Sequence, residues 1–189
     1  MGTTFTTQWQ RFVGDERGAV TAEFVVLFMP LCYMLFMIAE LSVYMTRQAL
    51  LERGLNMAVR DLRLGALEVP GLAEGAEPTE AQSAAAFRAR ICEGAFLLTE
   101  CNDRLRIEVT PFETFTEFGE SGFICPNTFD PDLSPMDLYT PVSRQQLTLV
   151  KACLVSSPIF PGVGLGAQMD WIEGSGYANV SRTAFISEP

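Results

Sequence analysis

The sequence contains no histidine at all. It therefore lacks the usual general base, a common zinc ligand and any Ser-His-Asp triad. An enzyme built from this chain would need paired carboxylates or an activated serine or cysteine, and no spacing in the sequence singles out such a group. We therefore expect no enzymatic activity and no cofactor.

Basic residues are scarce as well, with 13 lysines and arginines against 23 aspartates and glutamates, for a net charge of −10. The whole of this acidic excess lies from residue 66 on. A surface of this sign repels phosphate backbones, so we expect no nucleic-acid partner. It suits a solvated domain or a basic protein partner, and solubility is the commoner reason for such a charge.

One long apolar run stands near the N-terminus, from Phe24 to Tyr44, and its only charged side chain is Glu40. A helix of this length reaches about 30 Å, the thickness of the hydrocarbon core of a bilayer. The run is longer than the apolar core of a secretory signal, and no small-residue cleavage site follows it. We predict a single transmembrane helix in contact with membrane lipid.

The helical pattern continues beyond this run, with apolar residues on one face and arginines on the others. Gly65 follows the last periodic residue, where a helix C-cap belongs. The sequence thus predicts a helix over 19–64, transmembrane over 24–44 and amphipathic over 45–64. Pro30 predicts a kink or local break, and whether the long helix is continuous stays open.

The remainder of the chain has room for one modest extramembrane domain. Glycine, proline and acidic residues over 65–78 indicate a linker, which leaves a domain over 79–189. Thr79 to Gln82 fits a capping box and predicts the start of a helix. This domain therefore begins with a helix of its own.

After that helix the periodicity changes to two, which indicates strands. The strands are expected over 105–109, 145–155 and 177–186, with long loops over 119–141 and 156–176 between them. The sequence therefore predicts an α+β fold, with one helix and a three- or four-stranded antiparallel sheet that packs on the long N-terminal helix.

Cysteine use bears on the compartment. Cys32 lies inside the apolar run and is expected to be an inert buried thiol. The spacing of the other four excludes a C-x-x-C metal site and favours two disulfides over free thiols, with three connectivities possible. These four are Cys92, Cys101, Cys125 and Cys153. Disulfides indicate an oxidising compartment.

The arginines give the opposite orientation. Two precede the apolar run and four follow it, which by the positive-inside rule places the C-terminal domain in the cytoplasm. We follow the cysteines and leave this conflict standing.

For Glu40 near the end of the run, two alternatives remain open. Either it reaches the interface or makes a structural hydrogen bond, or it forms a salt bridge between subunits.

Four short segments carry a family resemblance. The segment Asp15-Glu16-Arg17-Gly18-Ala19-Val20-Thr21-Ala22-Glu23-Phe24 resembles the N-terminal signature of TadE-like minor pilins, or pseudopilins, of tight-adherence (Tad/Flp) pilus systems. The run ending in Ile38-Ala39-Glu40-Leu41 is similar to theirs, as is Thr46-Arg47-Gln48-Ala49-Leu50. The C-terminal segment Arg182 to Pro189 resembles a common ending in that family.

This resemblance implies a pilin-like fold and a cytoplasmic leader over 1–18, which a prepilin peptidase removes between Gly18 and Ala19. Glu23 then becomes the fifth residue of the mature chain and pairs with an N-terminal amine. The alternative for Glu23 is a simple position in the headgroup layer. The residue after the cut is alanine, where type IV pilins have phenylalanine or methionine.

The implied location is the bacterial inner membrane, with a single span, a periplasmic C-terminal domain and incorporation into an extracellular pilus. The implied partners are other pilin or minor pilin subunits, the prepilin peptidase and the inner-membrane pilus assembly platform. The chain would initiate, cap or anchor a pilus used in cell adhesion. A second hypothesis is an uncleaved single-pass envelope protein whose extracytoplasmic domain binds a ligand or protein partner.

Overall fold

The computed structural model describes residues 19–73, 76–112, 125, 138–143, 145–162 and 176–187. The chain divides into two compact units, Met1–Ala39 and Glu40–Pro189, and the first helix contributes to both. This is the expected α+β combination of a long apolar helix and a small mixed domain. In chain order the elements are α2 (Ala19–Arg63), α3 (Glu80–Gly94), α4 (Cys101–Arg104), β1 (Leu105–Phe112), β2 (Leu138–Tyr139), β3 (Leu147–Ser156) and β4 (Tyr177–Ile186).

Helix α2 continues through Pro30 without interruption, so the expected local break is not found in this helix. A proline removes one intrahelical hydrogen bond, and the neighbouring bonds are sufficient to keep the helix continuous. At its C-terminal end, Gly65 takes a left-handed conformation with φ of 65°. The next amide, of Ala66, donates to the carbonyl of Asp61 at 2.8 Å. This geometry confirms the predicted glycine cap.

The sheet has the strand order β2-β1-β3-β4. Strand β3 pairs antiparallel with both β1 and β4, whereas β2 pairs parallel with β1. The sheet is therefore mixed, and the prediction of a purely antiparallel sheet was wrong. Parallel pairing needs a long connection, which the segment between Phe112 and Leu138 supplies. Strand β2 has two residues, too few to give a periodic signal, and it lies inside a predicted loop.

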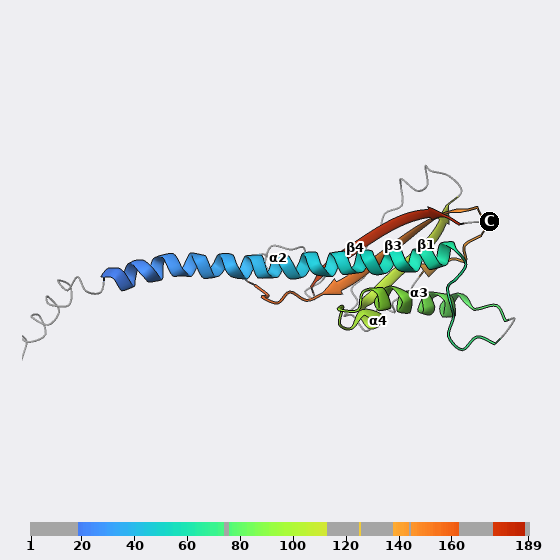
Figure 1. Cartoon of the computed structure of the whole chain (residues 1–189), viewed down its shortest axis with the longest axis horizontal. Helices are drawn as coiled ribbons and strands as arrows, with labels where there is room; N and C mark the ends of the chain where they lie inside the picture. The colour runs from blue at the N-terminus through green and yellow to red at the C-terminus, as the bar shows by residue number, and fades with distance from the viewer. Residues whose placement is uncertain are drawn as a thin grey trace, which may run out of the picture. The chain divides into compact units, whose positions relative to one another are not determined.

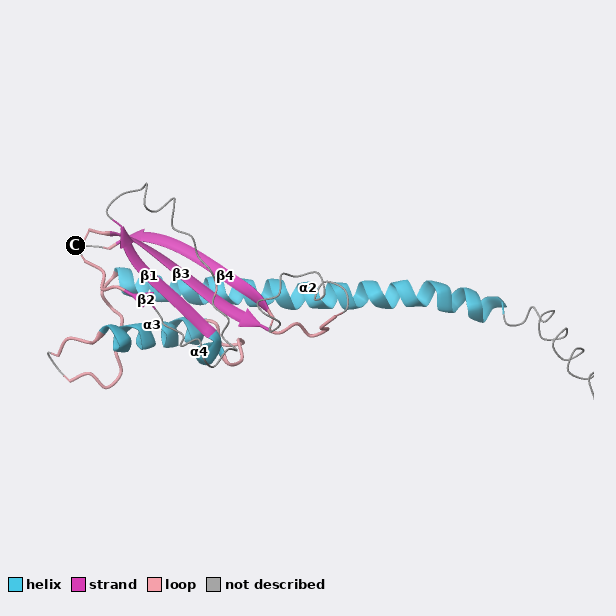
Figure 2. Cartoon of the chain, turned by 180° about the vertical axis from the view of Figure 1, so that it is seen from behind, coloured by secondary structure: helices cyan, strands magenta, loops and turns pink. Residues whose placement is uncertain are grey.

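We call the second unit, Glu40–Pro189, the folded unit. Its two main helices cover one face of this sheet. Figure 1 shows the C-terminal half of α2 and helix α3 in front of the strands, and Figure 2 shows the strands from the opposite side. The register of β1 and β3 places alternate apolar residues on the covered face. Burial of each large aliphatic side chain there stabilises the fold by about 1.5–3 kcal/mol. The core includes Leu51, Leu55, Ala58, Phe87, Ile91, Leu105, Ile107, Val109, Val150, Ala152 and Leu154.

Helix α3 begins with the predicted capping box, which is confirmed. Thr79 accepts a hydrogen bond from the amide of Gln82, and the Gln82 side chain accepts one from the amide of Thr79. Further along, α3 approaches α2 closely at two glycines. A Cβ atom on Gly54 would lie 2.3 Å from the carbonyl oxygen of Ile91, and one on Gly94 would lie 2.8 Å from the Cα of Gly54. Only glycine allows this approach.

Two cysteine pairs stand at disulfide distance. The Cα atoms of Cys92 and Cys101 are 5.7 Å apart, so this bond joins α3 to the short helix α4. The Cα atoms of Cys125 and Cys153 are 5.9 Å apart, which ties position 125 to strand β3. Of the three connectivities that the sequence left open, the structure selects this one. Cys32 is a free thiol in α2 and is partly exposed on the surface of the protein, so its burial within the membrane run stays a prediction.

Candidate functional site: helix α2 and the polar clamp at its midpoint

The predicted processing and pairing residues lie at the start of α2. Gly18 falls outside the described residues, and Ala19 is the first residue of the helix. Glu23 is exposed on α2. Its exposed carboxylate is thus open to a partner. The pairing with an amine stays a prediction.

The N-terminal half of α2 exposes an apolar surface. From Val20 to Ala39 nearly every residue is exposed, including Phe24 at 59% and Leu35 at 57%. Among the described residues, α2 is the one helix long and apolar enough to cross a membrane. A helix that is apolar on all sides and not covered by protein needs an apolar environment. The prediction of a span over Phe24–Tyr44 is compatible with this surface.

Glu40 behaves differently from the rest of the apolar run. Its side chain is only 1% exposed and accepts hydrogen bonds from the amides of Ile159, at 3.0 Å, and Phe160, at 3.1 Å. These amides belong to the loop that follows β3. Backbone donors of this kind satisfy a buried carboxylate without a second charge. Of the two alternatives for Glu40, the structure contains the structural hydrogen bond.

Two turns further along α2, Arg47 contacts the same region of the domain. Its guanidinium donates to the Tyr177 hydroxyl at 2.6 Å and to the carbonyl of Ser157 at 3.0 Å. Tyr44 meets the Tyr177 ring edge to face, with centroids 5.3 Å apart. Burial raises the pKa of Tyr177 above its ordinary value, although the Arg47 cation acts in the opposite direction. Tyr177 is therefore held as a neutral acceptor.

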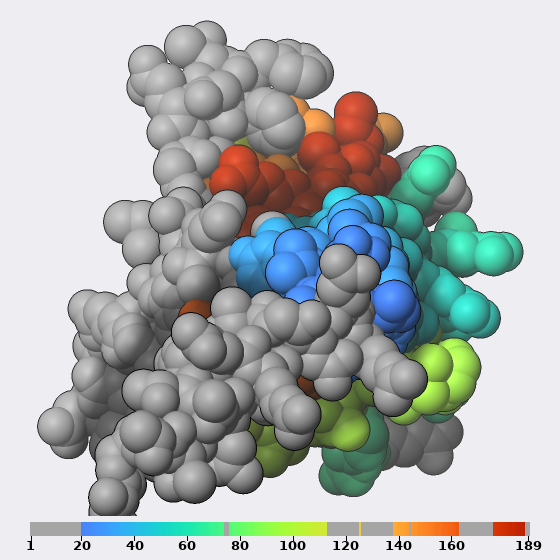
Figure 3. Space-filling model, turned by 90° about the vertical axis from the view of Figure 1, so that its left-hand side faces the viewer, coloured from blue at the N-terminus to red at the C-terminus, as the bar shows by residue number. Residues whose placement is uncertain are grey.

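Gln48 completes this contact on strand β4. Its amide group donates to the carbonyl of Val180 at 2.9 Å, and its oxygen accepts from the Asn179 side chain at 3.2 Å. We call Glu40, Arg47 and Gln48 the polar clamp. In Figure 3 the red strand β4 lies beside the cyan part of α2. The clamp fixes the midpoint of α2 to β4 and the loop after β3.

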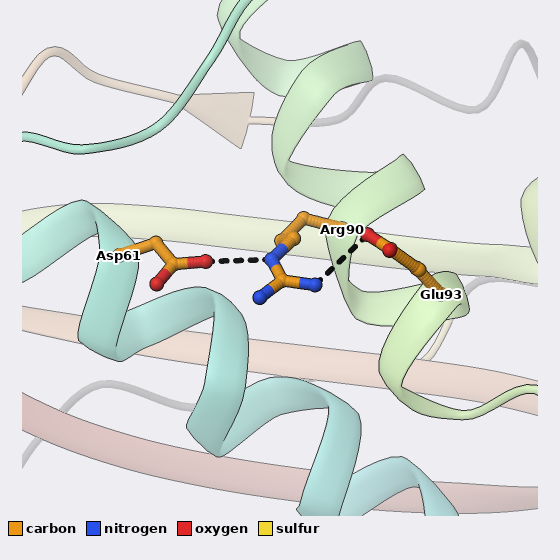
Figure 4. Close-up of polar contacts among 3 residues, drawn as sticks. All are labelled: Asp61, Arg90 and Glu93. Carbon is orange, nitrogen blue, oxygen red and sulfur yellow. Dashed lines mark hydrogen bonds and ion pairs between the residues drawn. The ribbon is translucent and has the colours of Figure 1, made fainter.

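A second polar contact fixes the C-terminal part of α2 to α3. Arg90 of α3 donates to Asp61 of α2 at 2.6 Å and to Glu93 at 2.8 Å, as Figure 4 shows. The two carboxylates raise the pKa of Arg90. Because these side chains are partly exposed, the ion pair contributes only modestly to stability.

The sequence did not assign roles to most of the clamp. Arg47 entered the sequence argument as a positive charge near the membrane and as part of a segment that carries the family resemblance, and Tyr177 and Asn179 entered it only as strand residues. The one signal in the sequence was the polarity of Arg47 and Gln48, which follow shortly after the apolar run and interrupt its pattern. Their partners are more than a hundred positions away in the chain, which no local period can reveal.

The folded unit also contains an open groove of about 510 Å³ beside the clamp. It is lined by Ser42 and Val43 of α2, by Leu97 in the α3–α4 loop and by Ser156 at the end of β3. Within the described ranges no group of three or more cysteine, aspartate or glutamate side chains is arranged to hold a metal ion.

No protein-family model, no curated protein sequence and no solved structure matches this chain.

Proposed function

We propose that this protein is a membrane-anchored minor pilin-like subunit, as its resemblance to TadE-like proteins of tight-adherence pilus systems implies. One observation carries the proposal. A single helix has an exposed N-terminal half that carries no charged side chain over residues 24–39, and its C-terminal half forms part of the core of an α+β domain. Such a helix can span a bilayer and later pack against the helices of neighbouring subunits, while the domain stays folded.

The proposed maturation step is cleavage between Gly18 and Ala19 by a prepilin peptidase. Glycine at the cut leaves the backbone unhindered. Cleavage would leave Glu23 as the fifth residue, near the N-terminus of an apolar helix. A carboxylate there is favoured by the helix dipole but costs several kcal/mol when it is buried unpaired in lipid. The new amine of a neighbouring subunit would neutralise this charge during assembly.

The proposed orientation places the C-terminal domain in the periplasm of a bacterium. The two cysteine pairs at bonding distance support an oxidising compartment. Three of the four conflicting arginines have other roles in the fold. Arg47 belongs to the polar clamp, and Arg60 and Arg63 lie in the last turn of α2, where the helix dipole favours cations. Their number is therefore a weak guide to topology.

Mass spectrometry tests the processing step. The full-length chain is expressed with and without a prepilin peptidase, and its mass is measured in the membrane fraction. We expect loss of residues 1–18 only when the peptidase is present. Gly18→Ala should block this loss, while Gly14→Ala, a matched glycine change outside the cut, should not. An intact leader in the presence of an active peptidase would refute the processing.

Shearing tests the assembly step. Processed subunit is expected in the sheared pilus fraction, alongside the other pilins. Glu23→Gln should lower that amount and leave cleavage unchanged, because the carboxylate acts after the cut. A chain that remains wholly in the inner membrane, uncleaved and absent from sheared material, would favour a single-pass envelope protein that binds a ligand or partner instead.

A further inference from the structure

Within the folded unit, the exposed side of α2 carries a row of arginines. Its members follow one another at intervals of three, four and three residues, so they lie on one side of the helix. All are exposed, on the side of α2 away from the core. The row is about 15 Å long, at 1.5 Å of rise per residue. We call it the arginine stripe, and its members are Arg53, Asn56, Arg60 and Arg63.

The folded unit does little to neutralise this stripe. Across the described residues, the side chains of Arg53 and Arg60 make no hydrogen bond and no ion pair. Glu52 is next to the stripe but accepts a hydrogen bond from Gln48. The helix dipole favours cations only in the last turn, which contains Arg60 and Arg63 but not Arg53. Like charges this close repel one another, and an acidic surface laid against them would remove that repulsion.

The connection between α2 and α3 has the opposite charge. From residue 64 to residue 87 the chain contains four glutamates and no lysine or arginine. Three of them, Glu68, Glu77 and Glu80, lie in described segments and are exposed. We call residues 66–80 the acidic connection. The folded unit thus carries one basic and one acidic surface.

A single copy cannot bring these two surfaces together along the whole stripe. The acidic connection begins after Gly65, and Arg53 precedes this glycine by twelve residues, which is about 18 Å of helix. An ion pair needs nitrogen and oxygen within about 4 Å of each other. The surfaces meet only at the far end of α2, where Arg63 and Glu77 line the same groove. The rest of the stripe is left for another molecule.

We propose that the arginine stripe binds the acidic connection of a second copy of this chain. Charge complementarity favours this occupant, because the whole acidic excess of the chain lies from residue 66 on. The copies are displaced along α2, so that the connection of one lies beside Arg53 and Arg60 of the next. Because the two surfaces differ, the contact passes head to tail from copy to copy. The inference concerns the folded unit and does not depend on cleavage of the leader or on incorporation into a pilus.

Energy transfer between copies tests this contact. Full-length chains carry a donor or an acceptor dye at the C-terminus and are mixed in micelles of an uncharged detergent. We expect self-association to weaken about tenfold between about 50 mM and about 500 mM sodium chloride, because salt screens exposed ion pairs. Net charge alone gives the reverse, since two chains of charge −10 repel each other less in salt. Self-association that rises with salt would overturn the proposal.

Charge exchange identifies the two surfaces. The double variant Arg53→Glu/Arg60→Glu makes the stripe acidic, and Glu68→Arg/Glu77→Arg makes the connection basic. Each variant alone should lose the salt-sensitive energy transfer, because its two surfaces then have the same sign. A mixture of the two should regain it, since every stripe again meets a connection of opposite sign. Transfer that stays at the parent level in either variant, or that the mixture does not restore, would contradict the proposal.

A single substitution at two exposed arginines separates the stripe from net charge. Arg53→Glu should weaken the salt-sensitive transfer, whereas Arg182→Glu, the same change on β4, should not. Equal losses would show that net charge is responsible and would overturn the proposal. Transfer that is insensitive to salt and shared by all variants comes from packing between spans. Its presence or absence bears on the proposed function and leaves the result for the stripe unchanged.

Discussion

The two halves of helix α2 have the same secondary structure and opposite environments. In the half before Glu40, Leu35 is 57% exposed, whereas in the half after it Leu55 is 1% exposed. The first half is apolar on every face over residues 24–39, and the second half carries one apolar stripe. The comparison teaches that helix formation here depends little on what covers the helix. The surroundings of each half are decided by how its apolar residues are distributed around the axis.

The largest expected effect comes from the same substitution made at one leucine in each half of α2. Leu55→Ala should lower the free energy of unfolding of the folded unit by about 3 kcal/mol, because it removes buried contacts and leaves a cavity. Leu35→Ala, the same change in the exposed half, should leave that free energy unchanged. Denaturant unfolding of the full-length chain in detergent measures both. Equal losses for the two variants would mean that the halves do not differ as described.

The next effect concerns the close approach of α2 and α3. Gly54→Ala should destabilise the unit by about 2 kcal/mol, because the added methyl group meets the carbonyl of Ile91 and the helices must move apart. Asn56→Ala, an exposed position on the same turn of α2, serves as the control and should be close to neutral. The same unfolding measurement applies. A stabilising Gly54→Ala would show that helix propensity outweighs the contact.

A smaller effect is expected at the polar clamp. Glu40→Gln should cost about 1 kcal/mol, because a neutral amide accepts hydrogen bonds from two backbone donors less well than a carboxylate does. Hydrogen exchange should accelerate at the amides of Ile159 and Phe160, which Glu40 binds. Glu23→Gln, the matched change at an exposed glutamate, should alter neither quantity. Unchanged exchange in Glu40→Gln would mean that this carboxylate does not hold the loop.

The smallest expected effect is a loss of folding stability at alkaline pH. Burial raises the pKa of Tyr177 in the folded chain above the ordinary value of 10.0. As the pH rises above 10.0 the unfolded chain loses its tyrosine protons first, so the folded unit should lose stability through the folded pKa. Tyr177→Phe should flatten this loss, with a remainder from Tyr139, whose pKa burial also raises. Tyr33→Phe, outside the folded unit, should leave the alkaline slope as it is in the parent chain.

Much of the fold was open to prediction because the signals were local. The capping box at Thr79, the glycine cap at Gly65 and the three long strands depend on neighbouring residues, and the structure contains all of them. The parallel strand β2 was not predictable, since two residues carry no period and its partner is fixed only by the packed sheet. The continuity of α2 at Pro30 depends on the neighbouring intrahelical hydrogen bonds, which the presence of a proline alone does not predict.

The candidate site divides in the same way. By itself, the sequence determined the apolar run, the register of Gly18 and Glu23 and the scarcity of residues for catalysis, because composition and spacing are properties of the chain alone. Only the tertiary structure decided that Glu40 is buried, that Arg47 and Gln48 bind strand β4, and which cysteines approach each other. These contacts join residues far apart in sequence, and the packing of α2 against the sheet is what brings them together.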